Sequence, residues 1–176
     1  MIESLYNPKT EAYLDLKNII CNDCTFNWGY YGRTTPGFEK GGHDNFGFYQ
    51  HPFLDRPTPE QHPYSRVCSA LIDHANVVVV ELLKKNNITV EVIYRISANC
   101  VHPTETNKYS VPHKDHLFPH KNLLVYLTDP AGGDTVCEGE SFLGKEDDVI
   151  IFEGEHYHRP PSKGRRIVLV ATYIDS

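Results

Sequence analysis

Long apolar runs are missing from this chain of 176 residues. A membrane-spanning helix needs about 20 consecutive apolar residues, and the apolar runs here are only a few residues long. The segment from Met1 to Pro8 also lacks the basic region and apolar stretch that are typical of a secretion signal. These absences predict a cytoplasmic protein that does not enter a membrane.

Basic charge is also scarce. The chain has 17 Lys and Arg against 23 Asp and Glu, which gives a formal net charge of -6. No run of Lys or Arg is longer than two residues. An acidic surface repels a phosphate backbone on average, so the sequence argues against a nucleic-acid partner.

The cysteines do not form a framework. There are five, an odd number, and Cys21 and Cys24 make one half of a zinc-ribbon pattern whose second pair is missing. Few thiols without a regular spacing are typical of a reducing compartment. We therefore interpret Cys21 and Cys24 as two unlinked thiols.

The apolar pattern predicts two helices followed by several short strands. Helical spacing is found over 9–20 and 66–85. After Asn87 the period changes to two, and strands are expected over 88–98, 120–128, 134–137, 147–152 and 165–174. This order predicts a mainly β fold, a double-sheet jelly roll with helices packed on one outer face.

No repeat or low-complexity linker divides the chain. We therefore expect a single domain over 1–176, with helices and aromatic loops in 1–87 and the jelly-roll core in 88–176. Residues 26–64 mix Gly, Pro and aromatic side chains without periodicity, which predicts ordered loops and short edge strands.

Part of this aromatic segment, residues 26–53, is a candidate lid. Loops held on a rigid scaffold commonly carry specificity, and we hypothesise that this segment covers a functional site. Trp28, Tyr30, Tyr31 and Phe48 would then contact a substrate. Ordinary packing is the alternative role for each of these side chains.

A His-x-Asp tripeptide at His113 and Asp115 is a candidate metal site. In an extended segment residues i and i+2 point to the same face, so an imidazole nitrogen and a carboxylate oxygen can meet at one ion. A third ligand must come from a distant strand, and His156 and His158 are available at the end of one. Two His and one carboxylate leave coordination positions open, as in non-haem Fe(II) oxygenases, whereas structural zinc takes four protein ligands.

Two arginines open the apolar strand that runs to Ile174. A buried guanidinium requires an anion, and the planar Arg fork suits a carboxylate. Alternation turns Arg165 and Arg166 to opposite faces. We expect Arg166 to bind a carboxylate in the site and Arg165 to pair with an acidic residue elsewhere.

Four blocks of the sequence resemble the 2-oxoglutarate/Fe(II)-dependent oxygenases, in particular the prolyl-4-hydroxylase-like branch. They occur in the family's order between Ile88 and Ile174, about half of the chain. The blocks are 113–115, 124–135, 149–159 and 164–169. The resemblance implies the double-stranded β-helix, which is a jelly roll, and a tight turn at 132–135.

The resemblance also implies roles for individual residues. His113, Asp115 and His158 match the iron ligands, and His158 is preferred over His156 because the form Phe-x-Gly-x-x-x-His-Arg fits better. His156 remains open as a pocket residue or a competing ligand. Arg166 matches the residue that binds the distal carboxylate of 2-oxoglutarate.

Two tyrosines near these blocks receive different interpretations. Tyr126 lies where related enzymes have a Tyr whose hydroxyl reaches the same 2-oxoglutarate carboxylate, and a Tyr in the sheet core is its alternative. Tyr109 is one residue farther from His113 than the Tyr that many members carry before the motif. We therefore give Tyr109 no role.

The activity implied by the resemblance is that of an Fe(II)-dependent dioxygenase. Such an enzyme uses O2 and 2-oxoglutarate and releases succinate and CO2. It hydroxylates a C–H bond of a peptide, for example in a prolyl residue, or of a small molecule. One alternative is a cupin-like metal-binding jelly roll without oxygenase activity, which would have no use for Arg166. Another is an assembly component with a vestigial site, since some bacterial viruses carry short forms of this family.

Overall fold

The computed structural model describes residues 1–35, 41–58 and 64–176. In these ranges the helices are α1 (Glu11–Asn22) and α2 (Ile72–Lys85). The strands are β1 (Ile2–Leu5), β2 (Gly29–Tyr31), β3 (Phe48–Asp55), β4 (Arg66–Val67), β5 (Val90–Val101), β6 (Lys121–Tyr126), β7 (Thr135–Cys137), β8 (Glu140–Phe142), β9 (Val149–Phe152), β10 (His156–His158) and β11 (Arg166–Asp175).

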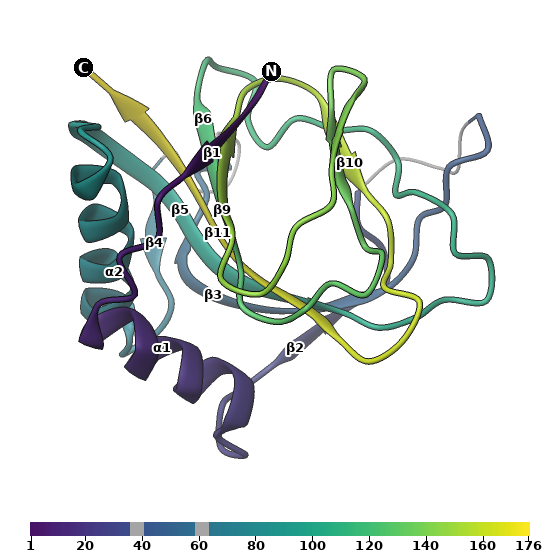
Figure 1. The fold of residues 1–176 in the computed structure, drawn as a ribbon, viewed down its shortest axis with the longest axis horizontal. Coiled ribbons are helices and arrows are strands. Elements are labelled where there is room, and N and C mark those ends of the chain that lie inside the picture. Colours follow the sequence, from purple (N-terminus) through teal and green to yellow (C-terminus); the bar gives the residue numbers. More distant parts are fainter. Residues whose placement is uncertain (36–40, 59–63) are drawn as a thin grey trace.

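The strands form two antiparallel sheets. The large sheet has the order β1-β9-β6-β11-β5-β3-β2, with β4 paired to β3, and the small sheet has the order β10-β7-β8. Both helices lie on the side of the large sheet away from β10 (Figure 1). The predicted mainly β jelly roll with helices on one outer face is confirmed. No helix in the described ranges has the length and apolar character needed to cross a bilayer.

Alternation along the central strands separates the two faces of the large sheet. On β6, Leu123 and Val125 pack in the core that includes the helices, while Leu124 and Tyr126 face the small sheet. On β11, Leu169 and Ala171 face the helices, and Val168 and Val170 face the other way. A strand with both faces covered has no polar side, which explains why these segments read as continuous apolar runs.

Helix α1 begins at a side-chain cap and is fixed to the sheet through one carboxylate. The Thr10 hydroxyl accepts a hydrogen bond from the backbone N–H of Tyr13 at 3.3 Å. The Tyr13 hydroxyl and the Lys17 ammonium both donate to Asp147 Oδ1 at 2.6 Å. The helix therefore lies against the turn that precedes β9.

Helix α2 begins later than the sequence predicts. The expected start at Arg66 is wrong, because Arg66 and Val67 pair with Asp55 and Leu54 of β3 as a short strand. The chain turns at Ser69, whose hydroxyl accepts from the Leu71 N–H at 3.2 Å. The four consecutive valines do lie in the helix as predicted.

Two strands of the N-terminal part were not expected at their full extent. The strand β1 pairs with β9 at the edge of the large sheet. The strand β3 pairs with β5 on one side and β2 on the other, so it is no short edge strand. Its register shifts between Pro52 and Leu54. A proline cannot donate to a ladder, so it lies at an irregularity in the pairing.

Candidate metal and co-substrate site

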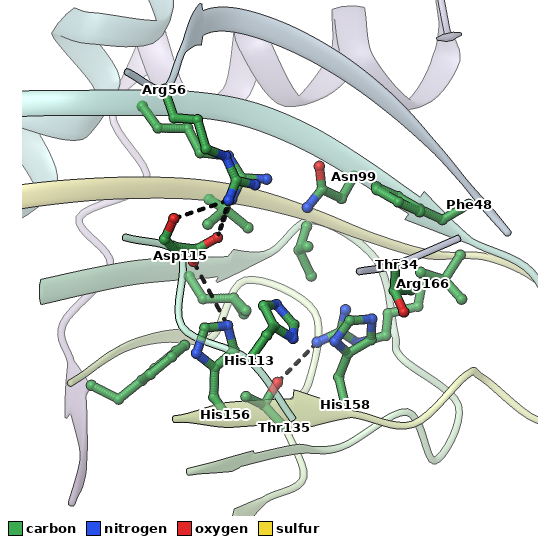
Figure 2. Close-up of a pocket in the computed structure, with 16 residues that line it drawn as sticks. Thr34, Phe48, Arg56, Asn99, His113, Asp115, Thr135, His156, His158 and Arg166 are labelled. Atoms are coloured by element: carbon green, nitrogen blue, oxygen red, sulfur yellow. Dashed lines mark hydrogen bonds and ion pairs between the residues drawn. The ribbon is translucent and has the colours of Figure 1, made fainter. Parts of the chain in front are cut away.

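Residues from loops and from strands of both sheets line one pocket between the two sheets. Its lining includes the predicted residues His113, Asp115, His158 and Arg166, together with His156, which the sequence left open (Figure 2). The predicted residue Tyr126 is fully buried and is not part of this lining. The fold thus brings together predicted site residues that are up to 53 positions apart in the sequence, from His113 to Arg166.

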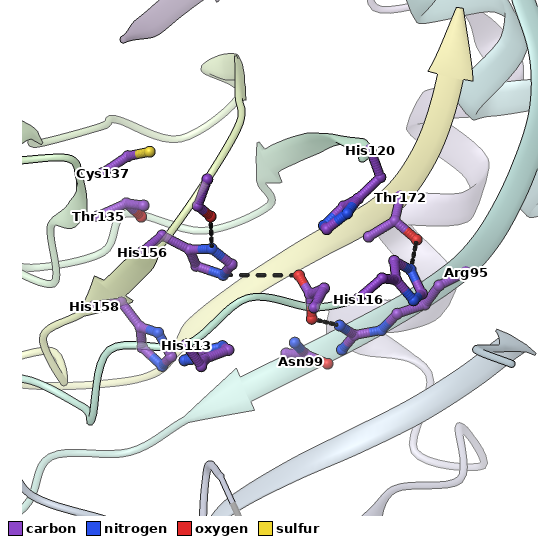
Figure 3. A network of polar contacts seen from close by, with 12 residues as sticks. Arg95, Asn99, His113, His116, His120, Thr135, Cys137, His156, His158 and Thr172 are labelled. Carbon is purple, nitrogen blue, oxygen red and sulfur yellow. Dashed lines mark hydrogen bonds and ion pairs between the residues drawn. The ribbon is translucent and has the colours of Figure 1, made fainter. Parts of the chain in front are cut away.

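Strand pairing places His113 directly opposite His156. The N–H of each residue donates to the carbonyl of the other at 3.0 Å, as in an antiparallel bridge. Side chains of such a pair point to the same face, and the two ring centroids are 4.5 Å apart. His113 and His156 therefore present their imidazoles side by side to the pocket (Figure 3).

The hydrogen bonds of these two rings fix their tautomers. His113 Nδ1 lies 3.0 Å from the Val111 carbonyl, and His156 Nδ1 lies 3.3 Å from the Gly154 carbonyl. A carbonyl only accepts, so each Nδ1 carries a proton, and in the neutral form of each ring the Nε2 is the nitrogen with the lone pair. A backbone carbonyl that holds the second ring nitrogen is typical of metal-binding histidines.

Asp115 completes this group from the same loop segment as His113. Its Oδ1 accepts from Arg95 Nη1 at 2.6 Å and lies 3.4 Å from Arg56 Nη1. Its Oδ2 lies 3.7 Å from His156 Nε2. Burial alone would raise the pKa of Asp115, but Arg95, His156 and Arg56 hold it well below its usual range. The carboxylate is therefore ionised and turns one oxygen toward the histidines.

The neighbouring residue His116 shows the alternation expected of an extended segment. Its Nε2 is 2.7 Å from the Thr172 hydroxyl on β11, away from His113 (Figure 3). Burial, with His120 nearby, lowers the pKa of His116 to about 4. This neutral imidazole packs beside the site and is not part of the pocket lining.

His158 lies at the other end of the histidine pair. Because β10 runs antiparallel to the 110–115 segment, His158 and Asp115 fall on opposite sides of the His113–His156 bridge. Two residues of strand span about 6.6 Å in each direction. The Nδ1 of His158 is 3.4 Å from the Ser110 hydroxyl.

Both candidate third ligands are uncharged at neutral pH. Burial lowers the pKa of His156 to about 4, and the nearby Asp115 carboxylate offsets only part of this effect. Burial and then the Arg166 guanidinium lower the pKa of His158 well below its ordinary value. A neutral imidazole is the form that binds a metal.

Within the described ranges, no three His, Cys, Asp or Glu side chains are already arranged so that they could hold a metal ion. The donor chemistry nevertheless fits one. Two imidazole Nε2 atoms with free lone pairs and one ionised carboxylate oxygen face the same space. Of the two candidate third ligands, His156 is the one whose ring packs against His113 and whose Nε2 approaches Asp115 Oδ2.

Arg166 is held rigidly at another wall of the pocket. It is 2% exposed, and its Nε donates to the Gly133 carbonyl at 3.0 Å. Its Nη2 donates to the Thr135 hydroxyl at 2.9 Å. Its Nη1 has no hydrogen-bond partner within the described ranges. An anion in the pocket would satisfy this last donor group.

The ring of Tyr126 packs against the guanidinium of Arg166. The guanidinium carbon lies 5.3 Å from the centre of the Tyr126 ring, a cation–π distance. The Tyr126 hydroxyl is 2.8 Å from the Thr135 hydroxyl. Sequence reasoning missed Thr135, because only the pairing of β7 with β10 brings it next to His158.

The remaining sequence interpretations fall outside the pocket. Tyr109 donates to Asp134 Oδ2 at 2.8 Å and stacks under Arg159, with 4.3 Å from the guanidinium carbon to the ring centre. Arg165 is exposed and donates to the Cys21 carbonyl at 3.3 Å, so its partner is no carboxylate. Cys21 and Cys24 are free thiols, as expected.

The aromatic segment reaches the pocket at two points. Thr34 and Phe48 are among the lining residues. Trp28 packs against Phe26 with ring centres 5.0 Å apart, beside the core, and Tyr30 and Tyr31 are 66% and 42% exposed. Residues 36–40 of the hypothesised lid lie outside the described residues.

Comparison with known proteins gives matches by structure alone. No protein-family model and no curated protein sequence matches the chain. An oxidoreductase of the 2OG-Fe(II) oxygenase family from Burkholderia pseudomallei superposes with a TM-score of 0.66 at 15% identity, over 98% of this chain and 84% of that one.

Two further structures agree with this match. A prolyl hydroxylase from Trichoplax adhaerens, in complex with a peptide fragment of the hypoxia inducible factor oxygen degradation domain, has a TM-score of 0.58 at 12% identity, over 99% and 83% of the chains. The non-heme alpha ketoglutarate dependent epimerase SnoN from nogalamycin biosynthesis has a TM-score of 0.54 at 11% identity, over 99% and 77%.

The chain therefore has the fold of the 2-oxoglutarate/Fe(II) oxygenases. The structural matches include a prolyl hydroxylase, in agreement with the resemblance seen in the sequence. At these identities the likeness establishes the fold, and a fold hosts several reactions.

Proposed function

We propose that this protein is a 2-oxoglutarate- and Fe(II)-dependent dioxygenase that hydroxylates a C–H bond of its substrate. The observation that carries the proposal is one pocket that has a possible metal-binding group on one side and a buried arginine on another. On one wall His113 and Asp115 face a third histidine, and on another a buried Arg166 keeps an unpaired donor. A metal-binding module without oxygenase activity, the cupin-like alternative, has no need of that arginine.

The proposed ligands of Fe(II) are His113, Asp115 and a third histidine. The sequence resemblance favours His158. The contacts favour His156, because its ring touches His113 and its Nε2 faces Asp115 Oδ2. We propose His156 as the third ligand and place His158 between the metal and Arg166.

When bound, Fe(II) would supply the site of O2 activation, coupled to the conversion of 2-oxoglutarate to succinate and CO2. The chain's own residues supply orientation. Arg166 Nη1 would bind the distal carboxylate of 2-oxoglutarate, and Thr135 and Tyr126 keep the guanidinium from rotating.

Apolar side chains close the rest of the pocket. The lining residues from the large sheet include Leu124, Phe152, Val168 and Val170, and each is at most 7% exposed. A wall without polar groups limits water near the metal. Arg95 holds the Asp115 carboxylate, so this ligand stays oriented while the co-substrate enters.

Anaerobic spectroscopy tests this function. Addition of Fe(II) and 2-oxoglutarate without O2 is expected to give a visible metal-to-ligand charge-transfer band. The band should disappear in His113→Ala, which lacks a proposed ligand, and should require more 2-oxoglutarate in Arg166→Ala. Absence of the band, or a band whose 2-oxoglutarate dependence is the same in Arg166→Ala, would favour the cupin-like or vestigial alternative.

The choice between the two histidines is tested with a pair of variants. We expect His156→Ala to lose Fe(II) binding, measured by calorimetry under nitrogen. His158→Ala should still bind Fe(II) and show weaker 2-oxoglutarate binding, since the side chain lies on the Arg166 side of the pair. The reverse pattern would restore His158 as the third ligand.

The substrate is proposed only by class. A peptide, including a prolyl peptide, and a small molecule both fit the reaction, and the Trichoplax enzyme was solved with a peptide fragment. Stimulation of succinate release by peptides and by free amino acids separates these two classes.

A further inference from the structure

The pocket carries more positive charge than 2-oxoglutarate accounts for. Its charged lining consists of Arg56, Arg95 and Arg166 against the single carboxylate of Asp115, in a chain whose net charge is -6. Bound Fe(II) and the 2-oxoglutarate dianion would cancel each other, so an excess of two positive charges would remain.

Arg95 is committed to the metal-binding wall. It is 6% exposed, and its Nη1 donates to Asp115 Oδ1 at 2.6 Å. A short bond between buried, charged partners is strong and directional. Arg95 therefore orients Asp115 and has its charge balanced by it.

Arg56 differs from Arg95 in exposure and in its bonding. Its side chain is 35% exposed. Its Nη1 donates to the backbone carbonyl of Asp115 at 3.0 Å and lies 3.4 Å from Asp115 Oδ1, the oxygen that Arg95 binds more closely. Its Nε and Nη2 have no hydrogen-bond partner among residues 1–35, 41–58 and 64–176. In Figure 2 Arg56 lies beside Asp115, and Arg166 lies apart from it near His158 and Thr135.

Asn99 offers a second donor on the same side of the pocket. Its Oδ1 accepts from Gln50 Nε2 at 2.9 Å and from the Ser97 hydroxyl at 3.3 Å. In the part of the chain that the structure describes, Nδ2 makes no hydrogen bond, and Asn99 lines the pocket. The ring of Phe48 stacks on Tyr31 at the same side, with centroids 5.4 Å apart. A ligand here meets N–H donors beside an aromatic ring.

We propose that Arg56, together with Asn99 Nδ2, binds a carboxylate of the substrate. The inference rests on the proposed dioxygenase function and narrows its substrate to a carboxylic acid. Because Arg56 also touches the metal-binding residue Asp115, the oxidised C–H bond lies only a few bonds from the carboxylate. Such a carboxylate belongs either to a free amino acid or to an acidic side chain of a peptide.

Matched carboxylate and amide probes test this assignment. The first arm uses the free L-amino acids and their primary amides, and the second uses N-acetylated, C-amidated tripeptides with central Asp or Glu against Asn or Gln. Binding is measured under nitrogen by calorimetry with Fe(II) and 2-oxoglutarate present. In the probe set that binds more tightly, the carboxylate should have a dissociation constant about 10- to 100-fold lower than its amide. This is the usual range for hydrogen bonds to a charged group.

Substitution of Arg56 should remove the preference without removing the site. In Arg56→Gln we expect carboxylate and amide to bind within about threefold of each other, because the glutamine keeps a donor but has no charge. Arg165→Gln, which removes one positive charge from an exposed arginine outside the pocket, serves as the matched control and should keep the full preference.

Asn99→Asp gives a second, nearly isosteric variant if Arg56→Gln does not fold. It keeps the oxygen used by Gln50 and replaces the pocket donor by an acceptor, so it should also abolish the carboxylate preference. An equal affinity of the natural chain for acid and amide in both arms, or a preference that survives in Arg56→Gln and in Asn99→Asp, would overturn the proposal.

The failure of this inference can be told from failure of the proposed function. The charge-transfer band with Fe(II) and 2-oxoglutarate reports on the function without any substrate. The same probe pairs are also titrated into metal-free protein, which measures the carboxylate preference alone. If the charge-transfer band forms but carboxylate and amide bind equally, only the proposed substrate class is overturned. If the carboxylate binds more tightly but no band forms, only the oxygenase proposal is overturned.

Discussion

Thr135 joins the two residues that hold the co-substrate end of the pocket. Its hydroxyl accepts a hydrogen bond from Arg166 Nη2 and is also hydrogen-bonded to the Tyr126 hydroxyl. Thr135→Val keeps the side-chain shape and leaves both partners unsatisfied. We expect the dissociation constant of 2-oxoglutarate, measured by the charge-transfer band, to rise about tenfold, since such a bond contributes about 1–2 kcal/mol.

A threonine outside the pocket provides the control. Thr128 accepts from the Ile167 N–H at 3.0 Å and donates to the Arg165 carbonyl at 2.8 Å. Thr128→Val should lower the free energy of unfolding by about 1 kcal/mol and leave 2-oxoglutarate binding unchanged. Equal effects of both variants on 2-oxoglutarate would contradict the role given to Thr135.

Gly132 and Gly133 are glycines for different reasons: Gly132 has a positive φ, and Gly133 has no space for a Cβ. A Cβ at Gly133 would lie 2.8 Å from Arg166 Cδ and 2.9 Å from the Arg159 carbonyl oxygen. Gly132 has a φ of +88° and open space around it. We therefore expect Gly133→Ala to displace Arg166 and weaken 2-oxoglutarate binding about tenfold or more, as the loss of one charged hydrogen bond would.

Gly132→Ala should instead cost about 1 kcal/mol of stability from its positive φ, with 2-oxoglutarate binding intact. Thermal unfolding and spectral titration of both variants check the pair. A normal co-substrate affinity in Gly133→Ala would show that Arg166 does not need its observed position.

Part of the site could be predicted from residue spacing and part could not. His113, Asp115 and Arg166 follow from i, i+2 alternation and from a charge at the start of an apolar strand. The same alternation cannot choose between His156 and His158, because it turns both side chains to one face. Arg56, Arg95, Asn99 and Thr135 enter the pocket only through strand pairing, which a single sequence does not reveal.

At the scale of elements, α1 depends on one turn residue. Burial alone would raise the pKa of Asp147, but hydrogen bonds from Lys17, Lys9 and Tyr13 lower it to about 2. The folded state thus favours the ionised carboxylate. Its stabilisation is complete above pH 4 and is lost as the pH falls toward 2.

Asp147→Asn tests this contact with little backbone strain, because Asp147 has a φ of +72° and Asn tolerates that region. We expect a loss of about 1 kcal/mol at pH 7, after discounting for solvent screening. Denaturant unfolding at pH 7 and near pH 2 should show the difference between the two proteins shrinking at the lower pH.

The neighbouring Glu146 gives a control for that measurement. It also pairs with Lys17, at 2.6 Å, from a half-exposed position. Glu146→Gln should change stability by no more than about 0.5 kcal/mol. A pH-independent effect of Asp147→Asn would contradict the assigned ion pairs.

Element boundaries show where sequence patterns mislead. Five of the strands after Asn87 were predicted because their alternation is regular, whereas the three-residue strands β8 and β10 were not predicted. The start of α2 was wrong, since Arg66 and Val67 gain partners on β3 that lie outside any local window. β3 was underestimated because Pro52 and the Gly-rich surroundings resemble loops, although its pairing with β5 makes it central.

At the scale of the whole molecule, strands from both ends of the chain share one sheet. β1 and β3 of the N-terminal part pair with β9 and β5 of the C-terminal part. We propose that residues 1–176 fold as one domain. The single Trp, Trp28, then reports unfolding of the N-terminal part together with the core.

Denaturant unfolding followed by Trp28 fluorescence and by far-ultraviolet circular dichroism tests this proposal. Coincident transitions with one midpoint are expected for a single cooperative unit. Two separated midpoints would mean that 1–87 and 88–176 unfold independently.

The central claim concerns the position of one metal ion. A crystal structure with Fe(II) and 2-oxoglutarate, with iron located by anomalous scattering, tests it most directly. We expect one iron bound by His113 Nε2, Asp115 Oδ2 and His156 Nε2, with 2-oxoglutarate bound to Arg166. Iron elsewhere, or an iron whose remaining positions are filled by further protein ligands, would contradict it.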